Sequence, residues 1–231
     1  MQIIEQSIAG VRSAVLRLTR RDTPLRFEIY PMVHIGEPAF YAAVTRRLRR
    51  CDLVVAEGVG RTSAGSLLTM SYRLPARFER SGLVVQDIDY ASLGVPVVNP
   101  DLSGAEFEAG WRELPLLQRA VLSAAGPLVG VDRLLFGSRR ALARQLELTD
   151  VEWHDRALEI DSADQLEELI VDRRDRLLIA ALDQIHRERC HEAITVAVVY
   201  GAWHVPAVID GLRGLHRYGV RGAEWLTVFS F

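Results

Sequence analysis

Apolar and polar residues alternate along residues 11–20 (VRSAVLRLTR), which is the pattern of a strand with one buried face. Residues 25–33 (LRFEIYPMV) predict a second strand, and the DTP turn at residues 22–24 joins the two. The first part of the chain therefore predicts a β-hairpin.

Two other segments are continuously apolar and predict central strands that are covered on both faces. These are residues 52–58 (DLVVAEG) and residues 193–200 (AITVAVVY). Shorter apolar runs predict further strands at residues 81–88, 94–101 and 225–231. The rest of the chain therefore adds strands to the same sheet.

Segments with helical periodicity lie between these strands. A helix is predicted over residues 38–50, with an apolar face formed by Phe40, Val44 and Leu48. A long amphipathic helix is predicted over residues 162–188, capped by Asp161 or Ser162, and its apolar stripe consists of Leu166, Leu169, Ile170, Leu177, Leu178, Ala181 and Ile185. A further helix is predicted over residues 204–219, and residues 104–147 are mainly helical.

The order of these elements predicts an α/β fold, with a mixed β-sheet flanked by helices. Residues 1–231 form a single domain in this interpretation. The helical insertion over residues 104–160 forms either a lid or a subdomain, and the sequence leaves that choice open.

Composition agrees with a globular protein, since 49% of the 231 residues are hydrophobic and 25% are charged. A formal net charge of −2 gives no electrostatic reason to expect nucleic acid as a partner. The N-terminus lacks the pattern of a signal peptide. Cys51 and Cys190 lie far apart, which is typical of reduced thiols, so we expect a cytoplasmic protein.

The most apolar long stretch runs over residues 114–137. Five residues interrupt it, namely Gln118, Arg119, Pro127, Asp132 and Arg133. A bilayer span needs about 20 predominantly apolar residues, so we expect no transmembrane segment here. Its apolar character fits a buried hairpin or a contact between two subunits of a homodimer.

Three candidate chemical groups directly follow predicted strands. His34 follows the strand at residues 25–33, Glu57 ends the run LVVAE, and His204 follows the strand at residues 193–200. Ligands and catalytic groups of α/β proteins gather at the carboxyl ends of the strands, so these side chains could meet at one point. A tight turn with positive φ is expected at Gly201, just before His204.

Two more residues are candidates with structural alternatives. Asp101 follows the strand at residues 94–101, where it binds substrate or caps the next helix. Arg174 belongs to a charged run that could form a solvated face of the long helix, but it lies near the apolar stripe and could instead point inward to the site. The remaining histidines lie among charged residues and are interpreted as surface groups: His154, His186, His191 and His216.

The order of these residues resembles the TraB/TIKI family, which belongs to a wider set with the GumN-like proteins. The family pattern has a GxxH, a glutamate after the next strand, an Arg-Asp pair in a late helix and a second GxxH. Here the second GxxH is Gly201 to His204, and the first is Pro31 to His34, with proline in place of glycine. Glu57 and Arg174-Asp175 match the other two positions, and Asp101 matches an acidic residue after the middle strand.

The resemblance implies a metal-dependent hydrolase, in particular a peptidase or amide hydrolase, with His34, Glu57 and His204 as the active centre. Two imidazoles and a carboxylate suit Zn, Mn or Co. Glu57 could be a ligand or the general base, and Arg174 could bind a substrate carboxylate or stabilise an oxyanion. The sequence does not separate these roles.

Two other functions remain open at this stage. The first is a non-catalytic protein that binds a peptide or small molecule on the same scaffold. The second is a metal-free, esterase-like hydrolase in which a histidine activates water and a carboxylate orients that histidine. The sequence contains no GxSxG nucleophile elbow and no glycine-rich phosphate-binding loop.

Overall fold

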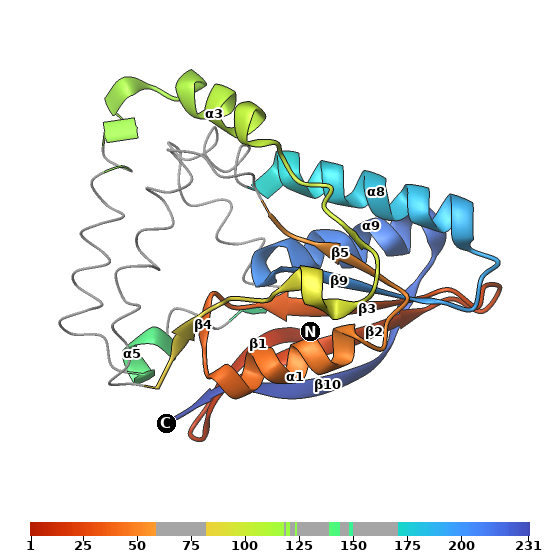
Figure 1. Cartoon of the computed structure of the whole chain (residues 1–231), viewed down its shortest axis with the longest axis horizontal. Coiled ribbons are helices and arrows are strands. Elements are labelled where there is room, and N and C mark those ends of the chain that lie inside the picture. Colours follow the sequence, from red (N-terminus) through yellow and green to blue (C-terminus); the bar gives the residue numbers. More distant parts are fainter. Residues whose placement is uncertain (59–81, 118, 121–122, 124–138, 144–147, 150–170) are drawn as a thin grey trace.

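A mixed sheet forms the centre of the molecule (Figure 1). The computed structural model describes residues 1–58, 82–117, 119–120, 123, 139–143, 148–149 and 171–231. These residues form an eight-stranded sheet in the order β7-β5-β9-β3-β2-β1-β8, and β10 pairs with β2.

Four described strands run parallel on one side of the sheet: β3 (Arg26–Met32), β5 (Leu53–Ala56), β7 (Val97–Val98) and β9 (Thr195–Gly201). β9 lies between β3 and β5, with Met32 opposite Gly201 and Ala56 opposite Val199. All four residues of β5 are buried, as expected for a strand covered on both faces. The parallel direction brings the carboxyl ends of these strands to one edge.

The other side of the sheet is antiparallel and consists of β1 (Gln2–Ser7), β2 (Gly10–Thr19), β8 (Leu148–Thr149) and β10 (Gly219–Ser230). β10 pairs with β2 along the whole length of β2, while β1 and β3 pair with its two halves. A separate two-stranded sheet is formed by β4 (Ile35–Gly36) and β6 (Val84–Val85).

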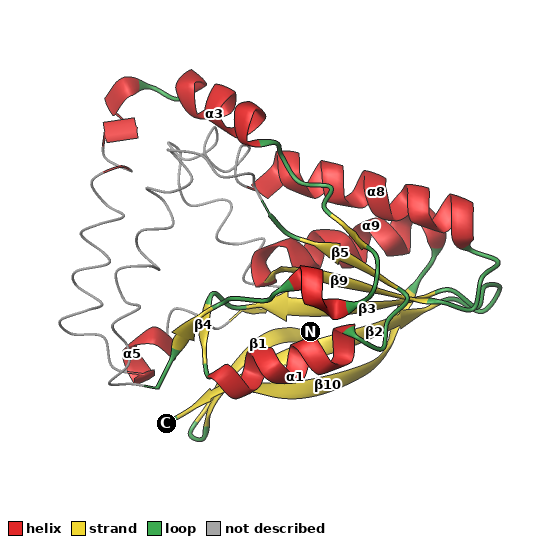
Figure 2. Cartoon of the chain, in the orientation of Figure 1, coloured by secondary structure: helices red, strands yellow, loops and turns green. Residues whose placement is uncertain are grey.

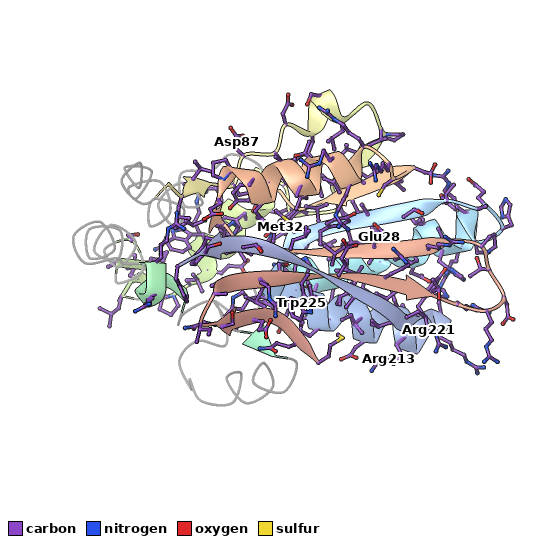
Figure 3. The ribbon with its side chains drawn as sticks, turned by 90° about the horizontal axis from the view of Figure 1, so that it is seen from below. Glu28, Met32, Asp87, Arg213, Arg221 and Trp225 are labelled. Atoms are coloured by element: carbon purple, nitrogen blue, oxygen red, sulfur yellow. The ribbon has the colours of Figure 1, made fainter. Side chains whose placement is uncertain are left out.

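Helices cover both faces of the main sheet (Figures 2 and 3). One face is covered by α1 (Pro38–Leu48), and the other by α8 (Arg173–Arg189) and α9 (Val205–His216). Short 3-10 helices run over Tyr90–Leu93 (η2) and Ala202–His204 (η4). Two further helices are α3 (Gly104–Glu113) and α5 (Arg139–Ala143).

The predicted α/β fold, a mixed sheet flanked by helices, is confirmed. The hairpin of β2 and β3 forms as expected, and Phe40, Val44 and Leu48 of α1 are buried. The strands predicted at residues 81–88 and 94–101 are only two residues long each, whereas the last strand begins earlier, at Gly219.

Several details of the sequence interpretation were wrong. β1 was not among the predicted strands. Leu177 is 38% exposed and does not belong to the apolar stripe of α8, whose buried leucines are Leu178 and Leu182. Ser103, not Asp101, caps α3, in a capping box with Glu106.

Much of the insertion at residues 104–160 lies outside the described residues, as do the start of the long helix and most of the apolar stretch at residues 114–137. The lid, the subdomain and the homodimer contact therefore stay predictions. No helix within the described ranges is both long enough and apolar enough to cross a membrane.

Candidate functional site

Each of the four parallel strands is followed by one of the candidate residues. His34 follows β3, Glu57 follows β5, Asp101 follows β7 and His204 follows β9. α8 adds Arg174 and Asp175 from the face of the sheet that it covers. Segments that are far apart in the sequence therefore meet at the carboxyl edge, as expected for an α/β protein.

The backbone of β9 fixes the Glu57 carboxylate. The Gly201 N–H donates to Glu57 Oε2 at 2.6 Å, and the Glu57 N–H donates to the Val199 carbonyl at 2.9 Å. A side chain at position 201 would place its Cβ 3.3 Å from Glu57 Oε2. The φ of Gly201 is −50°, so the expected positive φ was wrong, and glycine instead leaves room for the close approach of the carboxylate.

Arg174 joins the two carboxylates that follow β5 and β7. Its guanidinium donates to Asp101 through Nε at 2.8 Å and through Nη2 at 2.7 Å, and Nη2 also donates to Glu57 Oε1 at 2.5 Å. The Arg174 side chain is 8% exposed and that of Asp101 is fully buried. Arg174 points inward, as the sequence suggested, and its guanidinium contacts the acidic groups of the site.

Asp101 is also held by the backbone on both sides. Its carboxylate accepts hydrogen bonds from the N–H groups of Gly58, at 3.0 Å, and Leu102, at 2.8 Å. Asn99 ties the same two loops together, because its side chain donates to the Gly58 carbonyl and accepts from the Asp101 N–H. The carboxylate of Asp101 therefore positions Arg174, which in turn contacts Glu57.

His204 and Asp175 form a buried pair next to this network. His204 Nδ1 lies 2.7 Å from Asp175 Oδ1, and His204 Nε2 lies 3.8 Å from Glu57 Oε1. The two side chains are 5% and 9% exposed. A carboxylate on Nδ1 fixes the tautomer and the orientation of a histidine ring, so Nε2 is the nitrogen available for chemistry on the Glu57 side.

The charges of the site reinforce each other. Burial tends to raise the pKa of Glu57, but the interactions with Arg174, and then with His204 and His34, lower it below its usual value. The pKa of Asp101 is also lowered, because hydrogen bonds from Arg174 outweigh burial. Burial raises the pKa of Asp175, against the opposing influence of His204. Glu57 and Asp101 are therefore firmly ionised at neutral pH.

Two tyrosines line this network and were not predicted as site residues. Tyr200 is 1% exposed, and its hydroxyl has no hydrogen-bond partner among the described residues. Its ring packs edge-on against His204, with centroids 5.6 Å apart. Burial and the charge of Glu57 raise the pKa of Tyr90 to about 12. Tyr200 lies near the end of β9, four residues before His204, and this position was the sequence signal that could have placed it at the site.

His34 differs from the other site residues because its side chain is exposed. Its ring is among the groups whose electrostatic interaction lowers the pKa of Glu57, so it lies within electrostatic range of that carboxylate. Within the ranges that the structure describes, no group of three or more His, Cys, Asp or Glu side chains could hold a metal ion. The metal site of His34, Glu57 and His204 therefore stays a prediction.

A second histidine cluster corrects the interpretation of His186 as a surface group. His186 is 7% exposed, and its Nδ1 lies 3.1 Å from the Tyr218 hydroxyl. Its ring lies 3.8 Å from the ring of His216, which contacts Asp183 at 2.8 Å. This cluster joins the far ends of α8 and α9, away from the site around His204.

Comparisons with protein-family models, curated proteins and solved structures find no match for the chain.

Proposed function

We propose that the protein is a hydrolase that cleaves a peptide or related amide bond. The observation that carries the proposal is the buried Asp175–His204 pair beside the ionised Glu57 carboxylate. A histidine held by a carboxylate is the usual arrangement for general base catalysis. The position of the pair at the carboxyl edge of parallel strands agrees with this role.

In the proposed reaction, His204 Nε2 accepts a proton from a water molecule whose oxygen attacks the carbonyl carbon of the substrate. The carbon–oxygen bond forms, the carbon–nitrogen bond breaks, and Nε2 returns the proton to the leaving nitrogen. Asp175 stabilises the imidazolium that exists between these steps, through its 2.7 Å contact with Nδ1. Arg174 is a positioning residue, because its guanidinium holds Glu57 and Asp101.

The test is hydrolysis of a library of internally quenched peptides and of simple aryl esters. Asp175→Asn should lower kcat/KM by about 10²- to 10⁴-fold, because the amide no longer holds the reactive tautomer. Asp183→Asn is the matched control, since Asp183, also on α8, makes a similar contact with His216 of α9, at 2.8 Å. Equal activity of the two variants would contradict the proposed role of His204.

A metal-dependent form of the same hydrolase is the second candidate. One observation favours it: histidines that bind metals commonly donate their other ring nitrogen to a carboxylate, as His204 can to Asp175. In this form His34 would have to join Glu57 and His204 to hold the ion, since the three side chains do not form a ligand group within the described residues, and the ion would supply Lewis acidity and a water of lowered pKa. Stoichiometric Zn, Mn or Co in the untagged protein, lost in His204→Ala, would support this form.

Chelation separates the two forms of the hydrolase. Activity that survives a strong chelator supports general base catalysis by His204, and activity restored only by a divalent ion supports the metal form. Peptide binding without turnover across the whole library would overturn both. That result would instead support the alternative of a non-catalytic binding protein.

A further inference from the structure

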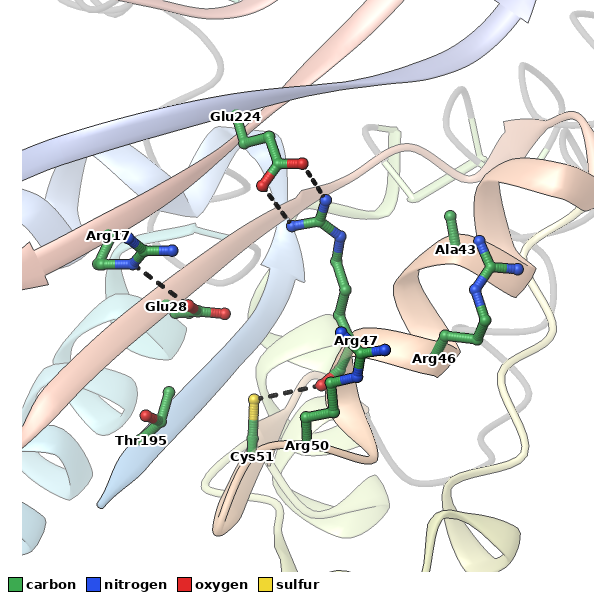
Figure 4. A pocket seen from close by; sticks show the side chains of 9 residues that line it. All are labelled: Arg17, Glu28, Ala43, Arg46, Arg47, Arg50, Cys51, Thr195 and Glu224. Carbon is green, nitrogen blue, oxygen red and sulfur yellow. Dashed lines mark hydrogen bonds and ion pairs between the residues drawn. The ribbon is translucent and has the colours of Figure 1, made fainter. Parts of the chain in front are cut away.

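A concave region lies at the opposite end of β9 from the candidate active site (Figure 4). It has a volume of about 490 Å³, which lies within the range of small-molecule sites. Thr195, the first residue of β9, contributes to its wall, whereas Gly201 at the other end of β9 contacts Glu57. The two regions are therefore separated by the length of a strand.

Charged side chains dominate the wall of this pocket: Arg17, Arg46, Arg47, Arg50, Glu28 and Glu224. Two of the arginines are paired. Arg47 extends to both carboxylate oxygens of Glu224, and Arg17 Nε lies 3.5 Å from Glu28 Oε1 (Figure 4). The two glutamates are thus matched by two guanidinium groups.

The guanidinium groups of Arg46 and Arg50 are in excess of the carboxylates that line the pocket. Both extend from the last turn of α1 or the residues just after it, and neither forms an ion pair with another residue that the structure describes. The four arginines and two glutamates leave the pocket with a local charge of +2, in a chain whose formal net charge is −2. A concave surface of one charge concentrates ligands of the opposite charge.

Two titratable groups in or next to the pocket are uncharged at neutral pH, namely Cys51, which lines it, and Tyr30, whose hydroxyl donates to Glu28. Burial, together with the charge of Glu28, raises the pKa of the Cys51 thiol to about 11. The same two effects raise the pKa of Tyr30. Neither group offsets the two positive charges of Arg46 and Arg50. One dianion would therefore balance the charge of the pocket.

We propose that this pocket binds a small soluble phosphate monoester, with the phosphate held by Arg46 and Arg50. A phosphate monoester carries about two negative charges at neutral pH, which balances the excess in the pocket. Guanidinium groups bind phosphate oxygens through paired hydrogen bonds, and the volume leaves space for an organic group beside the phosphate. A long nucleic acid chain would meet the carboxylates of Glu28 and Glu224 and is disfavoured.

Calorimetric titration of the full chain with adenosine monophosphate tests the proposal, with adenosine as the uncharged probe and sodium chloride keeping the ionic strength constant. Arg46→Gln or Arg50→Gln should weaken binding of the monophosphate by roughly tenfold each, since each removes charge-assisted hydrogen bonds. Arg49→Gln is the matched control, because Arg49 is exposed at the same end of α1 and does not line the pocket.

The expected result is equal binding of adenosine monophosphate by the wild type and Arg49→Gln, with no binding of adenosine. The double variant Arg46→Gln/Arg50→Gln should lose binding while its circular dichroism spectrum stays unchanged. Three results would overturn the proposal: no binding by the wild type, equal binding of adenosine, or unchanged binding by the double variant.

Discussion

Arg174→Met removes the guanidinium that neutralises Glu57 and Asp101. The arginine makes three hydrogen bonds to these carboxylates, at 2.8, 2.7 and 2.5 Å. The carboxylate of Asp101 is fully buried and that of Glu57 is 18% exposed, so water can replace little of what is lost. Removing one partner of a buried ionic network costs about 3–5 kcal/mol of the free energy of unfolding.

Urea denaturation at neutral pH measures this loss, and thermal unfolding should show a decrease in Tm of roughly 6–20 °C for a chain of this length. Arg173→Met is the matched control, since Arg173 is the exposed neighbour of Arg174 on α8. The control should change the free energy of unfolding by less than about 0.5 kcal/mol.

The dependence on pH gives a second, independent measurement. In the wild type the pKa values of Glu57 and Asp101 are lowered, so their contribution is present at neutral pH and is lost as the pH falls below about 4. In Arg174→Met the same carboxylates are buried without a cation, and their pKa values should rise. The variant should therefore gain stability as the pH falls from 7 toward 5.

Two results would refute this reasoning about Arg174. One is a free energy of unfolding for Arg174→Met that lies within about 1 kcal/mol of the Arg173→Met value, because breaking a buried ionic network should destabilise the fold by more than that. The other is a pH profile of Arg174→Met that is parallel to that of the wild type. Either would mean that the two carboxylates find water or other partners.

Three further predictions follow from contacts described above. Gly201→Ala should lower the free energy of unfolding by about 1–3 kcal/mol in urea denaturation, because the new Cβ would lie 3.3 Å from Glu57 Oε2. Burial lowers the pKa of His186, aided by nearby positive charges, so stability in urea should decrease as the pH falls through about 6.5, where the unfolded histidine gains a proton. Burial raises the pKa of the Cys51 thiol to about 11, so a disulfide reagent should modify the partly exposed Cys190 well before Cys51.

Each of these predictions has a control. Gly214→Ala in α9 meets no atom within 4 Å and should raise stability by up to about 1 kcal/mol, opposite in sign to Gly201→Ala. His186→Gln should flatten the pH dependence near 6.5, and an unchanged profile would contradict the assignment to His186. Modification of Cys51 and Cys190 at equal rates in the native protein would show that Cys51 is accessible.

The sequence predicted the parts of the fold that local patterns determine. β5 and β9 are continuous apolar runs, and their burial requires helices on both faces. Because parallel strands end at one edge, the sequence also predicted that Glu57 and His204 lie together, and His204 Nε2 lies 3.8 Å from Glu57 Oε1. Local periodicity and strand direction were sufficient for this part of the site.

Partners that lie far away in the sequence explain what was missed. Nothing in the residues near Asp175 shows that its carboxylate will orient the ring of His204, 29 positions later. His186 looked like a surface group because its neighbours in the sequence are charged, yet Tyr218 and His216 from another element cover it. β1 has no strong pattern of its own, and it forms a strand because β2 supplies hydrogen bonds.

The pairing of β10 with β2 has a consequence for how the chain folds during synthesis. Leu16 lies opposite Ala223, so β2 leaves the ribosome roughly 200 residues before its partner strand. At a translation rate of about 5–20 residues per second, the edge of β2 stays unpaired for about 10–40 seconds. A strand edge that is unpaired and carries apolar side chains can pair with another chain and aggregate. We therefore expect the nascent chain to need a chaperone during this interval.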